Sequence, residues 1–246
     1  MARIIDWKTL KDMGNLAVPG LVALYRQKVA TPEMMRSMLI ALGDSRDPRA
    51  GPALVEILSA ADPLVRRDAA RAIGDSNYKA GAKALEALAA DSKQDDEVRL
   101  FSATAGAKLE SEACVNVLKG LLESPRPEIR SRAVFALGKH GGVKHVAAIE
   151  KLLSDQDRSV REDTVEALRL LKDKAAWGPL VKATEDADYK VRNGAMDALR
   201  QLTKQKTGNE PKAWQEWWAK FGAKGEEGPK PVKAVIKEDV PDEPEN

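Results

Sequence analysis

The sequence predicts an all-α protein, an α-solenoid built from about six antiparallel two-helix repeats. One observation is a short pattern that recurs six times. It consists of an aliphatic residue, usually followed by Arg, then small residues, and then Ala-Leu-Gly or a similar tripeptide. Its first aliphatic residue is Met34, Val65, Val98, Ile129, Val160 and Val191 in turn. The steps of 31, 33, 31, 31 and 31 residues indicate stacked repeats rather than a closed globule. The second observation is that alternating apolar runs and hairpin dipeptides, the signals of strands, are nearly absent.

The composition favours closely packed helices. Hydrophobic residues make up 43% of the 246 residues and aromatic residues only 4%, and Ala and Leu dominate, which are strong helix formers. The 40 Lys and Arg balance 38 Asp and Glu, so the net charge is +2. This balance gives no general attraction to nucleic acid or to an anionic membrane. A single cysteine, Cys114, allows no disulfide within the chain, and we expect it to pack as a small hydrophobe rather than act as a reactive thiol.

Four segments are expected along the chain. An N-terminal cap segment covers residues 1–14, the six repeats cover 15–203, a Trp-rich capping helix covers 204–221, and a disordered tail rich in Pro and charge covers 222–246. The first ten residues lack the apolar core of a signal peptide, and no apolar run approaches the roughly 20 residues that span a bilayer. If Met1 is the natural start, we expect a cytoplasmic protein.

The second helix of each repeat is expected to start three residues before the aligned aliphatic residue. The residues at that position are Thr31, Asp62, Asp95, Arg126, Asp157 and Asp188. Five of the six have side-chain oxygens that can cap a helix, and Pro follows three of them at the first helical position. Apolar or small residues at positions 0, +4, +7 and +8 form one buried stripe. We expect Gly43, Gly74 and Gly138 to end their helices in the left-handed conformation.

The first helix of each repeat is a shorter apolar stretch, such as residues 53–58 and 146–153. Its last apolar residue, for example Leu58, Leu122 or Leu153, lies seven residues before the aligned aliphatic residue. A short turn fills that gap, so each unit is an antiparallel helical hairpin.

A repeated pair of opposite charges suggests a structural ladder. Arg follows the aliphatic residue in five copies, and in four of them an Asp stands four positions earlier, the favourable order for a helical ion pair. The residues of this ladder are Asp62 and Arg66, Asp95 and Arg99, Arg130, Asp157 and Arg161, and Asp188 and Arg192. We expect these groups to tie each repeat to its neighbour, because a residue repeated in every unit follows the stack rather than one site. An anion-binding ladder is the alternative.

These residues resemble HEAT-like repeats of the short bacterial type named after phycobilisome lyases. The resemblance covers residues 15–203 and rests on the pattern Asp-x-x-Val-Arg-x-x-Ala-x-x-Ala-Leu-Gly, with a period shorter than the roughly 40 residues of eukaryotic HEAT units. It implies a right-handed superhelix with the second helices on the concave side. Proteins of this type include bilin lyases, iron hydroxylases, alkylpurine DNA glycosylases and many scaffolds.

The residues give little support to these enzyme classes. The hydroxylases bind metal through His-Glu dipeptides, whereas neither His140 nor His145 is followed by Glu, and we expect both in a solvated loop. The glycosylases need a strongly basic surface, and Glu162, Asp163 and Glu166 fall on the expected concave face. A bilin lyase stays open as an alternative because it has no short motif to test. We expect no cofactor, no metal site and no catalytic residue.

The two ends of the stack depart from the pattern. The last predicted helix carries Trp214, Trp217, Trp218 and Phe221 on one face, with Asn209 as a possible N-cap, and it resembles a C-terminal Trp-rich motif of some bacterial HEAT-repeat proteins. We expect a lid over the last repeat, with an exposed interaction site as the alternative. At the other end, the Met residues at 34, 35 and 38 and the segment 4–7 are expected to cap the stack, with a plastic docking surface as the alternative.

A partner is expected on the outward face of the second helices. Positions +2, +3 and +6 make this face run from basic, through an apolar centre, to acidic, and aromatic anchors flanked by charge fit a peptide or protein segment. The candidate residues are Arg67, Arg71, Phe101, Thr104, Arg132, Phe135, Glu162 and Glu166. We therefore predict a non-catalytic scaffold or adaptor that binds a polypeptide on its concave face. In the alternative, the two-residue insertion near residues 92–96 shifts Phe101 into the core.

Overall fold

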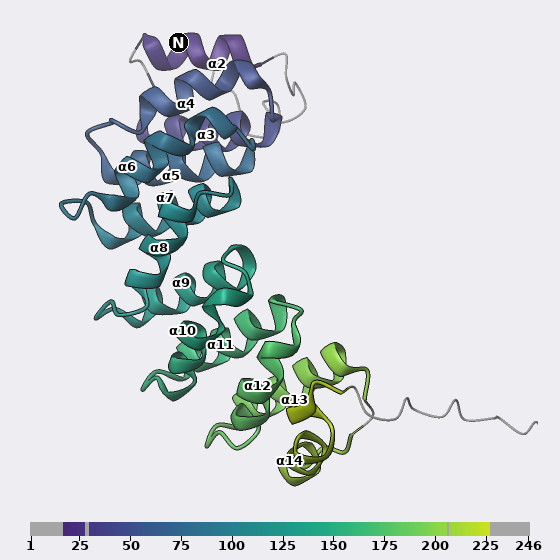
Figure 1. Ribbon diagram of the computed structural model, residues 1–246. Helices are drawn as coiled ribbons and strands as arrows, with labels where there is room; N and C mark the ends of the chain where they lie inside the picture. The colour runs from purple at the N-terminus through teal and green to yellow at the C-terminus, as the bar shows by residue number, and fades with distance from the viewer. Residues whose placement is uncertain (1–16, 28–29, 206, 227–246) are drawn as a thin grey trace, which may run out of the picture.

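The computed structural model describes residues 17–27, 30–205 and 207–226, and it confirms the predicted α-solenoid of two-helix repeats (Figure 1). Thirteen α-helices and no strands are found in this part of the chain. The expected cap segment 1–14, including residues 4–7, and residues 227–246 of the expected tail lie outside the described residues. None of the described helices combines the length and the apolar character that crossing a membrane requires.

The six repeats are consecutive helical hairpins, and a last helix follows them. The helices are α2 (Val18–Arg26) with α3 (Pro32–Ser45), α4 (Gly51–Ile57) with α5 (Pro63–Asp75), α6 (Ala82–Ala90) with α7 (Asp96–Lys108), α8 (Glu112–Leu121) with α9 (Pro127–His140), α10 (Val146–Glu150) with α11 (Arg158–Leu170), α12 (Trp177–Ala183) with α13 (Tyr189–Thr203), and α14 (Pro211–Lys220). Single 3-10 turns are η2 (Pro48–Ala50), η3 (Lys79–Gly81), η4 (Val143–His145), η5 (Lys151–Ser154), η6 (Lys174–Ala176) and η7 (Gly222–Lys224).

The second helices begin at the six predicted cap residues. Thr31 Oγ1 accepts a hydrogen bond from the Met34 amide at 3.3 Å, and the four Asp caps accept from amides two residues ahead at 2.7 to 2.8 Å. Arg126 supplies no such bond. There the Ser124 hydroxyl accepts from the Arg126 amide at 3.3 Å instead. These bonds satisfy amide groups that the first turn of a helix leaves without partners.

The three glycines that were expected to end helices lie inside them, so that prediction is wrong. Gly43, Gly74 and Gly138 are buried in α3, α5 and α9. A Cβ at each would lie 2.5 to 3.0 Å from an Ala at position +7 of the next second helix. These glycines therefore allow neighbouring helices to approach closely. The left-handed residues near helix ends are Arg46, Asn77, Glu110, Lys172 and Lys204.

The second helices form one continuous row, with each packed against the next from α3 to α13. The first helices mainly contact the second helices, and only α6 and α8 pack closely on each other within their row. The apolar core forms two clusters that meet at α7, because Ala105 belongs to the N-terminal cluster while Leu100 and Ala103 belong to the C-terminal one.

The predicted ladder exists in another form. The Asp residues at 62, 95, 157 and 188 cap their own helices, and none forms an ion pair within 4.0 Å with the Arg four residues later in the described chain. Nη1 of the Arg residues at 66, 130, 161 and 192 instead donates to two carbonyls of the turn before its helix. Ties between repeats form where Arg130 binds Asp155 and Arg161 binds Asp186, each 25 residues further on.

The ladder is interrupted in the N-terminal half. Arg99 lies 25 residues before Ser124, which lacks a carboxylate, and its Nε donates to the Ala89 carbonyl at 3.1 Å. After Arg66 the insertion places Lys93 at the corresponding point, and the buried Arg66 Nε has no hydrogen-bond partner among the described residues.

The last helix covers the end of the stack. Trp214 and Trp217 are 0% and 6% exposed, and Trp217 makes edge contacts with Trp177 of α12 and with Trp214, at ring-centre distances of 5.5 and 5.7 Å. Trp218 and Phe221 pack partly buried against the same core, so the Trp-rich segment is a lid. The N-cap residue of α14 is Glu210 rather than the predicted Asn209. The Asn209 side-chain oxygen instead accepts a hydrogen bond from Arg200 at 2.6 Å. Helical structure continues to Lys224, past the expected tail start at 222.

Candidate functional site

A groove opens across three second helices near the middle of the stack. We call it the aromatic groove, and its volume is about 350 Å³. Its lining residues are Leu100, Phe101 and Thr104 of α7, Arg132, Phe135, Ala136, Lys139 and His140 of α9, and Asp163 of α11. Four of the eight predicted partner-binding residues, Phe101, Thr104, Arg132 and Phe135, therefore line one hollow.

The groove lies where the regular contacts between second helices change. At two other junctions a polar residue at position +2 binds the residue at +3 of the next helix, since Arg36 binds Asp68 and Ser131 binds Asp163. At the junction of α7 and α9, position +2 is Leu100, so Arg132 at +3 meets no polar group from it. Position +9 of α7 is Ala107, where α3, α5 and α9 have glycine, and α7 packs less closely on α9 than on α5.

The apolar lining consists of a buried floor and two more accessible rings. Leu100 and Ala136 are 2% and 3% exposed, so Leu100 is a floor residue and not the outward-facing one that its position suggested. Phe135 is 37% exposed. Phe101 is half-buried and lines the hollow, with the guanidinium groups of Arg67 and Arg132 at 5.4 and 5.7 Å from its ring centre. Such contacts hold a ring in place by cation–π attraction.

The cations beside the groove differ in their partners. Arg67 is fixed by Asp68 and Glu97, at 3.1 Å each. Arg132 and Lys139 are exposed, and neither forms an ion pair within 4.0 Å with any residue that the structure describes. The same holds for Arg71, the remaining basic candidate, which is exposed but does not line the groove. The basic side of the face therefore keeps free charge.

The acidic side is neutralised from within. Glu162 pairs with Arg158 at 3.2 Å and Glu166 with Arg169 at 2.5 Å, so neither predicted acidic residue reaches into the groove. Asp163, on the rim, accepts a hydrogen bond from the Ser131 hydroxyl. Around the groove, two cations without an ion-pair partner in the described chain, Arg132 and Lys139, therefore face one carboxylate, Asp163, that keeps its charge.

Five of the nine lining residues are missing from the predicted partner-binding set, namely Leu100, Ala136, Lys139, His140 and Asp163. Lys139 and His140 stand at positions +10 and +11 of their helix, three and four residues beyond Ala136. A helix places residues three or four apart on one face, so the same face of α9 carries both residues one turn beyond Ala136.

Both histidines differ from the expected solvated loop. His140 is half-buried in the groove wall, and His145 is 8% exposed. Burial, followed by nearby Lys side chains, lowers the pKa of each below its ordinary value. In the part of the chain that the structure covers, no three His, Cys, Asp or Glu side chains are placed to hold a metal ion. Cys114 is fully buried, and burial raises the pKa of its thiol, as expected of a packed hydrophobe.

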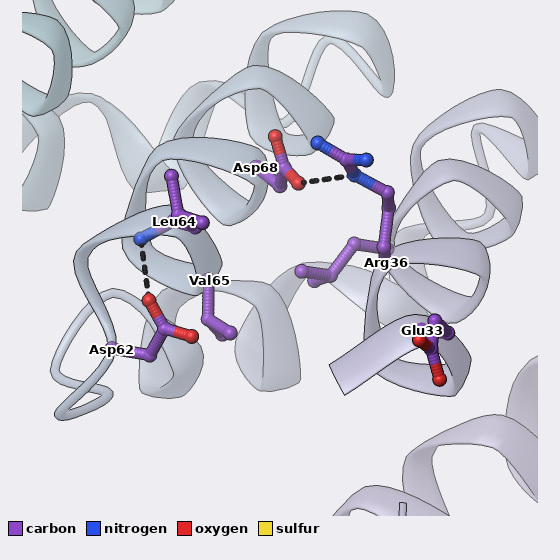
Figure 2. Close-up of a pocket in the computed structure, with 7 residues that line it drawn as sticks. Glu33, Arg36, Asp62, Leu64, Val65 and Asp68 are labelled. Carbon is purple, nitrogen blue, oxygen red and sulfur yellow. Dashed lines mark hydrogen bonds and ion pairs between the residues drawn. The ribbon is translucent and has the colours of Figure 1, made fainter. Parts of the chain in front are cut away.

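A second, smaller hollow of about 170 Å³ lies between α3 and α5 (Figure 2). Figure 2 shows Arg36 reaching across it to Asp68, at 3.4 Å, and Asp62 capping the first turn of α5 beside Leu64 and Val65. Because these polar groups already bind each other or the backbone, the hollow offers few free groups to orient a ligand.

Stacked two-helix units with a groove on the second helices define an α-solenoid repeat protein. The chain belongs to the HEAT repeat family, whose family model, described as HEAT repeats, matches residues 18–105, 89–169 and 146–213. No curated protein matches the sequence significantly.

Solved structures share the fold. A designed armadillo repeat protein, YIII(Dq.V1)4CPAF in complex with peptide (KR)4, is similar with a TM-score of 0.52 and 19% identity, over 75% of this chain and 99% of that one. The complex of CpcE and CpcF of phycocyanin lyase from Nostoc sp. PCC7120 gives a TM-score of 0.50 and 17% identity, over 89% and 90%. At such identities the similarity concerns the fold alone.

Proposed function

We propose that this protein is a non-catalytic scaffold or adaptor that binds a segment of another polypeptide, with the aromatic groove as the binding site. The observation that carries the proposal is the placement of Phe101 and Phe135 together over a buried apolar floor, on a face that is otherwise polar. Aromatic side chains in partly desolvated pockets are the usual energetic centres of protein interfaces.

The position of the groove on the stack supports this proposal. The second helices pack on one another along the whole row, whereas the first helices do so only at α6 and α8. The more closely packed row of a curved stack lies on the inside of the curve, and solenoids use such concave surfaces for binding. A designed protein of the same fold holds a peptide, which supports a polypeptide as the ligand class.

The test is affinity capture from native lysate with the wild-type protein and with Phe135→Ser. Phe135 is exposed enough that its replacement should leave the far-UV circular dichroism spectrum unchanged. We expect the captured proteins to be lost from Phe135→Ser. Phe101→Ser should lose the same proteins, because its ring lines the same hollow.

Tyr189→Ser is the matched control, because Tyr189 is an aromatic residue 67% exposed on α13 outside the groove. It should retain every captured protein. Identical capture by the wild type and Phe135→Ser would refute the proposed site.

A bilin-lyase-like enzyme is the second candidate, and the fold shared with the phycocyanin lyase complex is the observation that favours it. This candidate predicts transfer of a chromophore or a bound cofactor in the purified protein. Absorbance spectroscopy and mass spectrometry of the native protein distinguish the two functions, since a scaffold carries neither.

A further inference from the structure

We infer that the aromatic groove selects segments in which acidic residues flank a large apolar side chain. This inference rests on the proposed function and adds the chemical class of the partner. It follows from two sets of side chains around one hollow: cations that have no ion-pair partner among the described residues, and carboxylates that already accept an ion pair or a hydrogen bond.

The first set is Arg132 and Lys139, both exposed on α9 and both lining the groove. Arg132 meets no polar group from α7, because position +2 of that helix is the apolar Leu100. The guanidinium carbon of Arg132 lies 5.7 Å from the centre of the Phe101 ring. This contact positions the guanidinium beside the apolar floor. A guanidinium held in this way can bind a carboxylate through two parallel hydrogen bonds.

The second set is the acidic residues of the face. Glu162 and Glu166 are paired with Arg158 and Arg169, and the groove carboxylate Asp163 is bound by Ser131. A basic segment would meet the free cations Arg132 and Lys139 and would have to compete for carboxylates that already have partners. An acidic segment meets complementary charge, and like charges across an interface suppress the wrong partner.

The apolar part of the partner is set by the floor. Leu100 and Ala136 are almost fully buried beneath the Phe101 and Phe135 rings, so the hollow accepts an aliphatic or aromatic anchor. A hollow of about 350 Å³ is large enough for one such side chain and too small for a folded domain. The expected partner is therefore a short extended or helical segment that carries both the apolar anchor and the carboxylates.

The experiment is selection from a random twelve-residue peptide library displayed on yeast, using the full chain as the labelled target. Phe135→Ser serves as the counter-target that removes the groove. We expect the enriched peptides to carry Asp or Glu within a few positions of Leu, Ile, Phe or Trp. A selected acidic peptide should bind Arg132→Glu/Lys139→Glu at least tenfold more weakly, and this loss should shrink at high salt.

The charge-reversed protein gives the second arm. Both side chains are exposed, so the variant should keep its helicity, and a parallel selection on it should enrich basic residues around the same apolar anchor. The synthetic peptide of residues 232–246, which has an apolar stretch followed by several acids, is a further probe. Its binding to the wild type and not to the charge-reversed protein would support the inference.

The outcomes separate the inference from the proposed function. Enrichment of basic or uncharged peptides that still require Phe135 would overturn the inference and leave the groove a peptide site. No enrichment over the Phe135→Ser counter-target would overturn both.

Discussion

Arg130 and Asp155 belong to neighbouring repeats, and their side chains form two hydrogen bonds of 2.7 Å each. The same guanidinium donates to the Ser124 carbonyl at 2.9 Å, so it joins the turn before its own helix to the turn before the next. Asp155 also accepts from the Asp157 amide at 2.9 Å. Because Arg130 binds the carboxylate, the pKa of Asp155 lies below its ordinary value. This arrangement couples the starts of α9 and α11.

Asp155→Asn should lower the free energy of unfolding by about 2 kcal/mol, because a charge-assisted hydrogen-bond pair is lost in a site where the carboxylate is mostly buried. Urea unfolding followed by circular dichroism at neutral pH measures the change. The same substitution at Asp186, which Arg161 binds at 2.8 Å, should have a similar effect.

A double-mutant cycle tests whether the pair itself is responsible. Arg130→Gln and Asp155→Asn should show a coupling free energy of about 1 kcal/mol or more. Arg130→Gln with Asp186→Asn is the matched cycle, because Asp186 binds Arg161 rather than Arg130, and it should show almost none. Equal coupling in both cycles would contradict the ladder.

The distance over which each interaction acts decides how much of the fold could be predicted from sequence. The caps at Asp62 and Asp188 involve amides two or three residues away, so local spacing was sufficient. The partner of Arg130 lies 25 residues further on and becomes adjacent only in the stack. The i–4 Asp was the wrong partner because its carboxylate already binds amides of the first turn. Gly138 was misassigned because a glycine that permits close packing and one that ends a helix look alike in sequence.

The candidate site was predicted in part for the same reason. Helical spacing places Phe101 and Phe135 on one face, and in the structure both line the aromatic groove. It could not show that Leu100 turns into the floor, because that depends on how α9 sits beside α7. It also could not show that Glu166 is neutralised by a neighbour, since the choice of an ion-pair partner depends on side-chain geometry.

Gly138→Ala should destabilise the protein by about 1–3 kcal/mol, because overpacking a close contact forces the helices apart. A Cβ at this position would lie 2.5 Å from the Cα of Ala167, and backbone cannot move away as a flexible side chain can. Thermal unfolding measures the effect.

Gly120→Ala is the control, since a Cβ there meets nothing within 4 Å and the residue lies in α8. Replacing a helical glycine at an open site should stabilise the protein by about 0.5–1 kcal/mol. Opposite signs for the two substitutions are expected, and a stabilising Gly138→Ala would show that α9 and α11 do not pack in this way.

Trp214→Ala should cost about 3–5 kcal/mol, the usual effect of removing a fully buried aromatic side chain. Trp214 is 0% exposed and contacts Trp217 edge-on, so its removal opens the lid over the last repeat. Urea unfolding measures the loss.

Fluorescence quenching checks the lid independently. In a Trp7→Phe background the remaining emission should be blue-shifted and resistant to iodide, because Trp177, Trp214 and Trp217 are buried. Emission typical of fully exposed indoles would contradict the lid.

The control for the unfolding measurement is Tyr189→Ala. This residue is 67% exposed, so the substitution should change the free energy of unfolding by less than about 0.5 kcal/mol.

Stability should fall as the pH is lowered from about 7.5 to 5.5, because two histidines have lowered pKa values in the folded protein. Burial is the main cause at both His140 and His145. The unfolded chain therefore binds protons more readily in this range. The stability contribution of the neutral histidines is complete above the ordinary value of 6.5. It declines below that value, by at most about 1.4 kcal/mol per pH unit for each histidine.

Unfolding midpoints at several pH values give the slope of stability against pH. His140→Gln/His145→Gln should flatten the slope, because the pKa of a paired carboxylate such as Asp155 is lowered further away from this pH range by its hydrogen bond with Arg130. An unchanged slope in that variant would assign the effect to other groups.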